Sequence, residues 1–214
     1  MSTSLLYHGF RVIGTHDVST RYEKGWIIFT VKEKPASLRC PVCGSKKVLR
    51  KGKVLRQFRT LPIGSNRVWI EMAIPRIKCL SCGIIRQIKL AFADERKYDT
   101  RSFERVVLEL SRYITIWDIA RHLGVSWDVV KGIQKRYLGK HFSHPQLKDL
   151  EQIAIDEISM GKRHSYLTVV LDLKSGAVVF VGEGKGSEAL KPFWRRLKLS
   201  GAQIDAMAID MSPA

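Results

Sequence analysis

Cys40-Pro41-Val42-Cys43-Gly44 and Cys79-Leu80-Ser81-Cys82-Gly83 repeat one pattern, and together they contain all four cysteines of the 214-residue chain. A Cys-x-x-Cys-Gly turn directs two thiolates toward one centre, and its glycine permits the tight backbone that other residues resist. Two such turns predict a tetrahedral Zn²⁺ site with Cys40, Cys43, Cys79 and Cys82 as its ligands. Because a β-rich insert separates the turns, the pattern is typical of a zinc ribbon.

Two disulfides or an iron site are the alternatives to zinc. The N-terminus has no basic segment followed by an apolar core, so we expect a cytoplasmic protein without a signal peptide, in which disulfides are rare. The sequence has no other redox motif that would favour iron. With four protein ligands the metal has no open position for substrate, so we expect it to stabilise the fold and not to catalyse. Several basic residues near these turns could meet phosphates or form an ordinary solvated face: Lys46, Lys47, Arg50, Lys51, Lys53, Arg56 and Arg59.

Residues 1–95 form a β-rich region around these turns. Two β-branched and aromatic runs in residues 7–33, separated by polar residues and Gly25, predict a hairpin. A second strand-rich region extends from Val48 to Cys79, with its turn at residues 62–66.

Helical periodicity begins near Thr100, and residues 96–140 are interpreted as a helix-turn-helix domain. Ser102, Thr115 and Ser126 are predicted to begin three helices. Within residues 115–138, the small Ala120 allows a close helix crossing, and Gly124 suits a turn position with positive φ. A plain three-helix bundle without DNA contact is the alternative. If the motif binds DNA, the residues expected to contact it are Arg121, Ser126, Trp127, Lys131, Gln134, Lys135 and Arg136.

The charge distribution favours a polyanionic partner for the first part of the chain. Residues 151–214 contain eight Lys and Arg and eight Asp and Glu, so the whole net charge of +17 lies in residues 1–150. This asymmetry favours double-stranded DNA as the partner, although charge that only aids solubility is the alternative. No apolar run is long enough to predict a membrane span.

Residues 141–151 are predicted to be a linker, and residues 152–214 change to an α/β pattern of three strands, a helix and a strand. That order is the order of an RNase H-like fold. Asp156 follows the first strand and Asp210 follows the last strand. If these strands are neighbours, the two carboxylates meet at one end of the sheet, where they could hold Mg²⁺ for phosphodiester transfer. The predicted fold class is therefore multidomain α+β, with a zinc ribbon, a helical domain and a partial RNase H-like domain.

The series of two cysteine turns, Leu61-Pro62-Ile63-Gly64, the helix-turn-helix, IAIDEIS (153–159) and AIDMSPA (208–214) resembles bacterial insertion-sequence transposases of the ISL3 family. The resemblance implies that Asp156 and Asp210 are the first two catalytic carboxylates and ligands of Mg²⁺. It implies that Glu157 is not a metal ligand, and that Lys162, His164 and Tyr166 lie near DNA. It also implies that the third carboxylate is a Glu beyond Ala214, so that the chain is C-terminally truncated and inactive alone. Glu188 is not expected to replace that Glu.

The expected function is recognition of the terminal inverted repeats of an insertion sequence, with two-metal strand cleavage and transfer in a complete relative. A non-catalytic DNA-binding regulator derived from a transposase is the alternative, with residues 151–214 serving in a homodimer. A third reading, an RNA-binding zinc-ribbon protein, is disfavoured because the sequence reveals no stacking aromatic platform.

Overall fold

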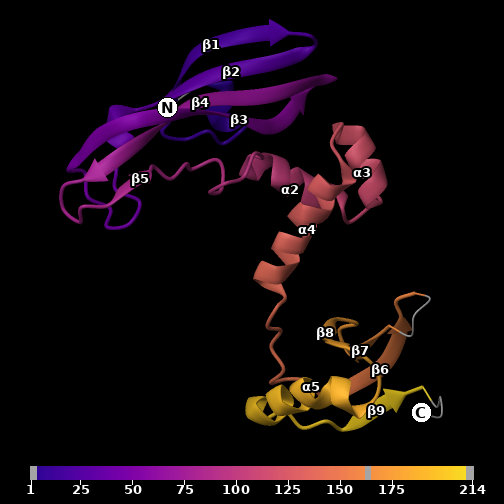
Figure 1. Ribbon diagram of the computed structural model, residues 1–214. Helices are drawn as coiled ribbons and strands as arrows, with labels where there is room; N and C mark the ends of the chain where they lie inside the picture. Colours follow the sequence, from indigo (N-terminus) through magenta and orange to yellow (C-terminus); the bar gives the residue numbers. More distant parts are fainter. Residues whose placement is uncertain (1–3, 162–164, 211–214) are drawn as a thin grey trace. The chain divides into compact units, whose positions relative to one another are not determined.

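The computed structural model describes residues 4–161 and 165–210, and it divides into two compact units, Met1–Arg136 and Tyr137–Ala214. Each unit is described by itself. The described residues form a mixed α+β fold with two sheets and five α-helices (Figure 1). No helix among them is long and apolar enough to cross a membrane.

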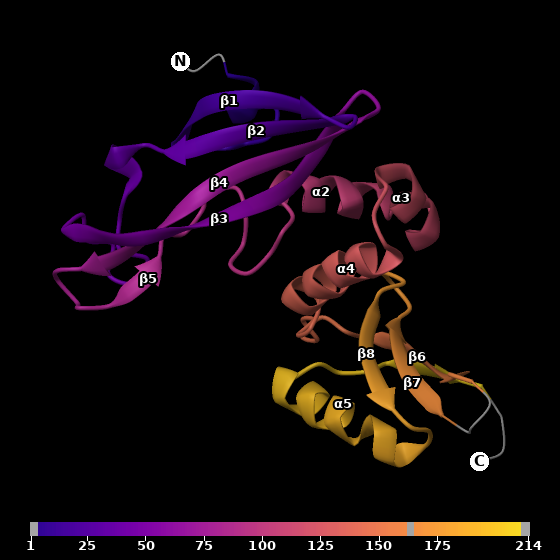
Figure 2. The same ribbon diagram turned by 45° about the horizontal axis from the view of Figure 1, so that its top comes forward.

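The first unit is built on a sheet with the strand order β1-β2-β4-β3, and β5 pairs with β4 beyond this path (Figure 2). The bounds are α1 Leu5–His8, β1 Thr15–Glu23, β2 Trp26–Glu33, a 3₁₀ turn Pro35–Ser37, β3 Val48–Ile63, β4 Asn66–Cys79 and β5 Ile85–Gln87. Both predicted hairpins are present, with turns at Lys24-Gly25 and Gly64-Ser65. The hairpins join through a parallel pairing of β2 with β4, which runs in register from Trp26↔Arg67 to Val31↔Met72.

Alternation along these strands divides the sheet into an apolar face and a mixed face. Val68, Ile70, Met72 and Ile74 of β4 are buried in a core that also contains Phe58 of β3. Burying such side chains contributes about 1.5–3 kcal/mol each. The intervening residues of β4 face the other way. Glu71 among them accepts hydrogen bonds from Arg21 of β1 (3.1 Å), Thr30 of β2 (3.5 Å) and Gln57 of β3 (3.0 Å). The hydrogen bond from Gln57 has the largest effect on the Glu71 carboxyl and lowers its pKa. Burial raises the pKa, but the hydrogen bond and charge of Arg21 lower it again, so the pKa stays below its ordinary value.

Three helices complete the first unit, and the last continues past its end: α2 Arg101–Leu110, α3 Ile116–Leu123 and α4 Trp127–His141. Phe103 and Val107 of α2 pack against Ile119 of α3 and Val130 and Ile133 of α4 in a separate core. Thr115 is the predicted cap of α3, and its hydroxyl accepts the N–H of Asp118 at 3.2 Å. The predicted cap Ser102 is wrong. Thr100 caps α2, and its hydroxyl accepts the N–H of Phe103. The same hydroxyl donates to Thr60 of β3, which holds Thr100 in this place. The Ser102 hydroxyl donates instead to the carbonyl of Phe10.

The second unit contains a four-stranded sheet of order β8-β7-β6-β9 with α5 on one face (Figure 2). The bounds are β6 Gln152–Ser159, β7 Tyr166–Asp172, β8 Val178–Glu183, α5 Ser187–Ser200 and β9 Ala206–Ile209. Neighbouring strands β6, β7 and β8 are antiparallel, whereas β9 is parallel to β6. Phe193 and Leu197 of α5 pack on Ile153 and Ile155 of β6. The pairing of β6 with β9 confirms that the first and fourth predicted strands are neighbours.

Candidate metal centre and nucleic-acid surface

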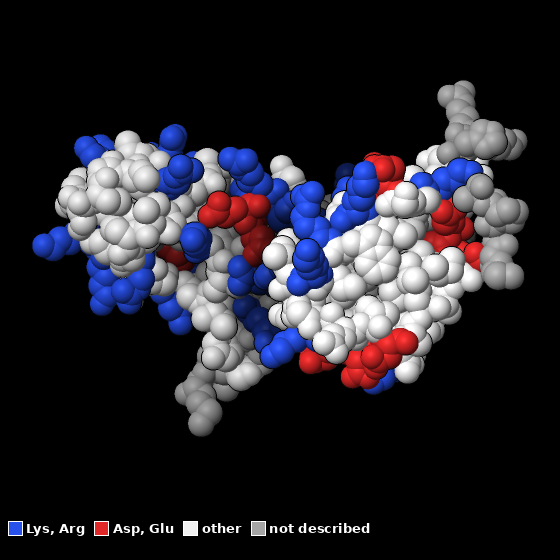
Figure 3. Space-filling model, turned by 90° about the horizontal axis from the view of Figure 1, so that it is seen from below, with Lys and Arg blue, Asp and Glu red and all other residues white. Residues whose placement is uncertain are grey.

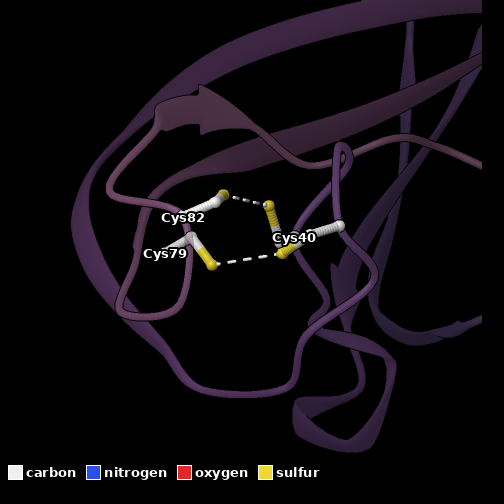
Figure 4. Close-up of side chains that lie close together, drawn as sticks. Cys40, Cys79 and Cys82 are labelled. Carbon is white, nitrogen blue, oxygen red and sulfur yellow. Dashed lines mark hydrogen bonds between the residues drawn. The ribbon is translucent and has the colours of Figure 1, made fainter.

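The four cysteines gather where β3 begins and β4 ends (Figure 4). Their Sγ atoms all lie within 4.8 Å of one another, with Cys40–Cys82 at 3.7 Å and Cys43–Cys79 at 3.5 Å. These separations are far longer than a disulfide bond of about 2.05 Å. They are close to the edge of about 3.8 Å expected for a tetrahedron with Zn–S bonds of about 2.3 Å. The donor set and its spacing therefore fit a structural Zn²⁺.

The two turns that carry the cysteines have the same internal hydrogen bonds. Gly44 donates to the Cys40 carbonyl and Gly83 to the Cys79 carbonyl, both at 3.0 Å, and both glycines have φ near +70°. The turns also contact each other, because the N–H of Leu80 donates to the Lys47 carbonyl at 2.9 Å and the Ser45 and Ser81 hydroxyls lie 2.9 Å apart. These hydrogen bonds hold the two turns side by side, with their four thiols directed toward one centre.

The thiols differ in how readily they ionise. Backbone N–H groups of Cys82 and Ser81 outweigh burial and lower the pKa of Cys79 to about 6. The N–H of Ile84 lowers the pKa of Cys82, but burial and the three neighbouring thiols outweigh it and raise that pKa to about 12. The Cys79 thiolate thus forms easily, and its negative charge disfavours ionisation of the neighbouring thiols. A divalent cation bound between them removes this repulsion.

Helices α3 and α4 present a surface of exposed basic and aromatic side chains. The residues exposed there are Arg121, Ser126, Trp127, Lys131 and Lys135. The guanidinium of Arg121 lies over the ring of Trp117 at 5.1 Å, and the ammonium of Lys131 over the ring of Trp127 at 5.0 Å. Exposed Lys and Arg side chains are spread over the face of the molecule seen in Figure 3, with Asp and Glu in smaller patches.

Gln134 and Arg136 contact α2 instead of standing free. Gln134 donates to the Ser111 hydroxyl at 2.8 Å, and Arg136 forms an ion pair with Glu104. Three of the basic residues near the cysteine turns are also engaged within the first unit. Arg50 pairs with the buried Glu33 at 2.7 Å, Arg56 donates to the Lys97 carbonyl at 2.6 Å, and Arg59 pairs with Asp99 at 3.1 Å. These partners are distant in sequence, so composition alone did not reveal them.

The turn between α3 and α4 depends on Gly124. It ends α3 at φ 62° and ψ 43°, in the left-handed region, and its N–H bonds back to the carbonyl of Arg121. A Cβ at this position would lie 2.2 Å from Nη2 of Arg67, whose side chain lies against the turn. The backbone and the neighbouring side chain thus both select glycine.

Gly124→Ala is expected to lower the free energy of unfolding by about 1–2 kcal/mol, the cost of a left-handed non-glycine residue, and to displace Arg67. Gly132→Ala is the matched control, because Gly132 lies inside α4 with its nearest neighbour at an ordinary 3.6 Å. The control is expected to gain up to about 1 kcal/mol in helix propensity. Chemical denaturation of both variants measures this difference, and equal shifts in one direction would contradict the role of the turn.

The prediction that Asp156 follows the first strand is wrong, because β6 continues to Ser159 and Asp156 pairs with Val169 of β7. The register of β6 with β9 ends at Ile155↔Ile209, so Asp156 and Asp210 each come directly after the last residues that pair these two strands. Both side chains are exposed, and the Asp156 carboxylate accepts the N–H of Glu157 at 2.7 Å. Because Ile153 and Ile155 face α5, strand alternation directs Asp156 to the opposite side of the sheet.

The remaining residues singled out in this region have other surroundings. Glu157 accepts the N–H of Gly186, which precedes α5, at 2.7 Å. Glu188 lies in the first turn of α5, the helix that covers the other face, and pairs with Lys191 at 2.5 Å. Tyr166 begins β7, and the ammonium of Lys185 lies 5.3 Å from its ring centroid. Lys162 and His164 lie outside the described residues.

Two family models match the chain at the two sites described above. The model for the zinc-finger of the transposases of IS204, IS1001, IS1096 and IS1165 matches residues 37–82, and an ISL3 transposase model matches residues 153–214. Curated relatives include the transposase of insertion sequence element IS1001 from Bordetella parapertussis, 30% identical over 82% of this chain and 43% of the relative. The chain belongs to the ISL3 transposase family.

Transposases of element IS1557 from two strains of Mycobacterium tuberculosis are also similar, at 30% identity over 86% of this chain and 42% of their own length. The chain thus spans less than half the length of these ISL3 relatives. The family match and the cysteine geometry together support structural zinc and confirm the zinc-ribbon prediction.

Sequence reasoning missed one feature of the mixed face of the first sheet. Trp26 of β2 and Trp69 of β4 stack with ring centroids 5.7 Å apart, and Arg59 of β3 lies 5.2 Å from the Trp69 ring. This row of rings was not expected from the sequence. Trp69 lies within an alternating strand pattern, but the parallel pairing that brings Trp26 beside it leaves no local signal in the sequence.

Proposed function

We propose that this chain recognises double-stranded DNA at the terminal inverted repeats of an insertion sequence, and that its second unit contributes two carboxylates to two-metal strand cleavage and transfer. In this proposal residues 1–95 carry the zinc ribbon and residues 96–140 form the helix-turn-helix. Residues 141–151 are the linker, and residues 152–214 form part of an RNase H-like catalytic domain.

DNA recognition is assigned to the exposed surface of α3 and α4. The beginning of α4 carries Ser126 and Trp127, followed one turn later by Lys131 and two turns later by Lys135. A helix that presents such residues near its N-terminal end suits the major groove, with Arg121 of α3 at the phosphates. Gln134 and Arg136 would serve recognition indirectly, because their contacts with Ser111 and Glu104 hold α4 on α2.

The observation that carries the catalytic part is the parallel register of β6 with β9. This register pairs Ile155 with Ile209, the residues directly before Asp156 and Asp210, although more than fifty residues separate the two acids in the sequence. The strand order β8-β7-β6-β9 with α5 between β8 and β9 also agrees with an RNase H-like topology. Carboxylate oxygens are the ligands that Mg²⁺ prefers, and two exposed carboxylates leave room for a phosphate between metal and solvent.

Metal binding at the two carboxylates is tested with Mn²⁺ as a paramagnetic substitute for Mg²⁺. Backbone NMR signals of residues 155–157 and 209–210 are expected to broaden on addition of Mn²⁺, and Asp156→Asn is expected to abolish this broadening. Glu188→Gln is the control, because α5 lies on the other face of the sheet. Unselective broadening, or identical broadening in Asp156→Asn, would refute the assignment.

DNA cleavage distinguishes the transposase from the non-catalytic regulator. The proposal expects Mg²⁺-dependent nicking at the end of a terminal inverted repeat when residues 152–214 are joined to the remainder of a catalytic domain, and loss of nicking in Asp156→Asn. Specific binding of the repeat without nicking at any metal concentration would favour the regulator.

A further inference from the structure

A hollow of about 190 Å³ lies inside the first unit, between one end of its sheet and the turn that joins α3 to α4. Strands β2, β3 and β4 contribute the aromatic and basic part of its wall, and α3 contributes Leu123 and Gly124. The residues that line it from the sheet and that could bind a ligand are Trp26, Arg59, Arg67 and Trp69.

Trp69 and Arg67 bring polar groups to this hollow that differ from Arg59 in having no described partner. The Nε1–H of Trp69 is buried and has no hydrogen-bond partner among the residues that the structure describes. A buried donor left unpaired costs about 1–3 kcal/mol, so such a group in a native protein calls for an explanation. Arg59 is neutralised by Asp99 at 3.1 Å, whereas Arg67 has no ion pair with any described residue.

The aromatic groups of the hollow form a row across three strands. Arg59 of β3 lies over Trp69 of β4, which stacks on Trp26 of β2 with an angle of 28° between the rings. Trp26 ends this row and remains 40% exposed. A guanidinium and two indoles that lie in a row offer a flat aromatic surface on which a further planar ring can stack.

We propose that this hollow binds one unpaired nucleotide of the DNA, with its base stacked on the tryptophan pair and its phosphate at Arg67. A nucleobase supplies a flat ring that continues the row beyond Trp26, and the phosphate supplies the anion that Arg67 lacks. Only an unpaired base can offer its face in this way, because stacking hides the face in a duplex.

The position of the hollow relates this site to DNA recognition, and the proposal rests on the DNA binding proposed above. Gly124 lines the hollow and lies three residues before Trp127, the first residue of α4. A duplex read by the N-terminal end of α4 would therefore pass close to the hollow. The site would select DNA ends or distortions in which one base has left the stack.

The experiment compares two fluorescein-labelled duplexes by anisotropy with the full chain loaded with zinc. One duplex is fully paired, and the other contains a single unpaired 2-aminopurine nucleotide. Stacking on an aromatic side chain predicts about tenfold tighter binding of the second duplex, together with quenching of 2-aminopurine fluorescence. Trp26→Ala is expected to remove both the preference and the quenching while leaving the affinity for the paired duplex unchanged.

Two further variants make the result specific. Trp69→Phe keeps an aromatic ring behind Trp26, so it is expected to keep the preference and the quenching with no loss of folding. Trp194→Ala, in α5 of the second unit, is the control and should retain the full preference. Equal affinity of the wild type for both duplexes, or a preference that survives Trp26→Ala, would overturn the proposal.

These outcomes separate the hollow from the proposed function. Loss of paired-duplex binding in the wild type, with a preserved Trp26-dependent affinity for the unpaired nucleotide, would contradict helix-turn-helix recognition and support the hollow. Binding of the paired duplex without any preference for the unpaired nucleotide would support helix-turn-helix recognition and contradict nucleotide binding in the hollow.

Discussion

Cys79→Ser is expected to abolish stoichiometric zinc binding and to unfold the two cysteine turns. Cys79 is fully buried, and its Sγ lies 3.5 Å from that of Cys43, so a hydroxyl there leaves three thiolates around an incomplete site. Structural zinc in small domains contributes roughly 10–16 kcal/mol of apparent binding free energy at neutral pH, and much of it is free energy of folding. This is the largest effect that we expect from any single substitution in the chain.

Metal analysis and amide hydrogen exchange measure this outcome. The wild type should contain one zinc ion per chain, and Cys79→Ser should contain none and lose protection at residues 40–49 and 77–87. Ser81→Ala is the matched control, because it removes the contact with the Ser45 hydroxyl but no thiol. Zinc affinity should also fall as the pH falls, because each ligand thiol must lose its proton. Full protection after removal of zinc with a chelator would contradict a structural role.

The affinity for double-stranded DNA is expected to fall about 40-fold when the salt concentration rises fourfold. Three exposed cations on α3 and α4, namely Arg121 at the phosphates and Lys131 and Lys135 along the groove, would each come near enough to a phosphate to release one counterion. Three contacts predict a slope of about −2.7 in a plot of log affinity against log salt. Lys131→Ala and Lys135→Ala should each reduce the magnitude of this slope by about 1.

Fluorescence anisotropy over a salt series gives these slopes. Lys191→Ala is the control, because Lys191 lies on α5, pairs with Glu188 and belongs to the part of the chain whose charges balance. Its slope should equal that of the wild type. A flat response in the wild type would show that the positive charge of residues 1–150 does not contact DNA phosphates.

Features encoded by neighbouring residues were predictable from the sequence. Each cysteine turn, the Thr115 cap and the Gly124 turn are closed by hydrogen bonds within five residues, so their signals lie in short stretches even where distant residues also contact them. The strands of the second unit were found for a similar reason, because apolar runs such as Val178–Val181 and Ala206–Ile209 differ clearly from the polar residues around them.

Features that depend on distant partners were not predictable. Thr100 caps α2 in place of Ser102 because β3 supplies Thr60, forty residues away. Gln134 and Arg136 look like groove contacts on α4, yet Ser111 and Glu104 of α2 bind them. The Trp26–Trp69 stack requires β2 to lie parallel to β4, and nothing within either strand specifies its neighbour. The sequence pattern thus predicts where helices and strands lie more completely than it predicts which distant residues they contact.

The β3–β4 hairpin carries the cysteine site at one end and the Trp26–Trp69 hollow at the other. Cys79 ends β4 beside the metal centre, whereas Arg67, near its beginning, lines the hollow. At about 3.3 Å per residue, the 14 residues of β4 extend on the order of 45 Å. One turn of B-form DNA is about 34 Å long. The hairpin is therefore longer than one helical turn of DNA. If a duplex lies along it, the nuclease footprint should be longer than the half-site that a single recognition helix contacts.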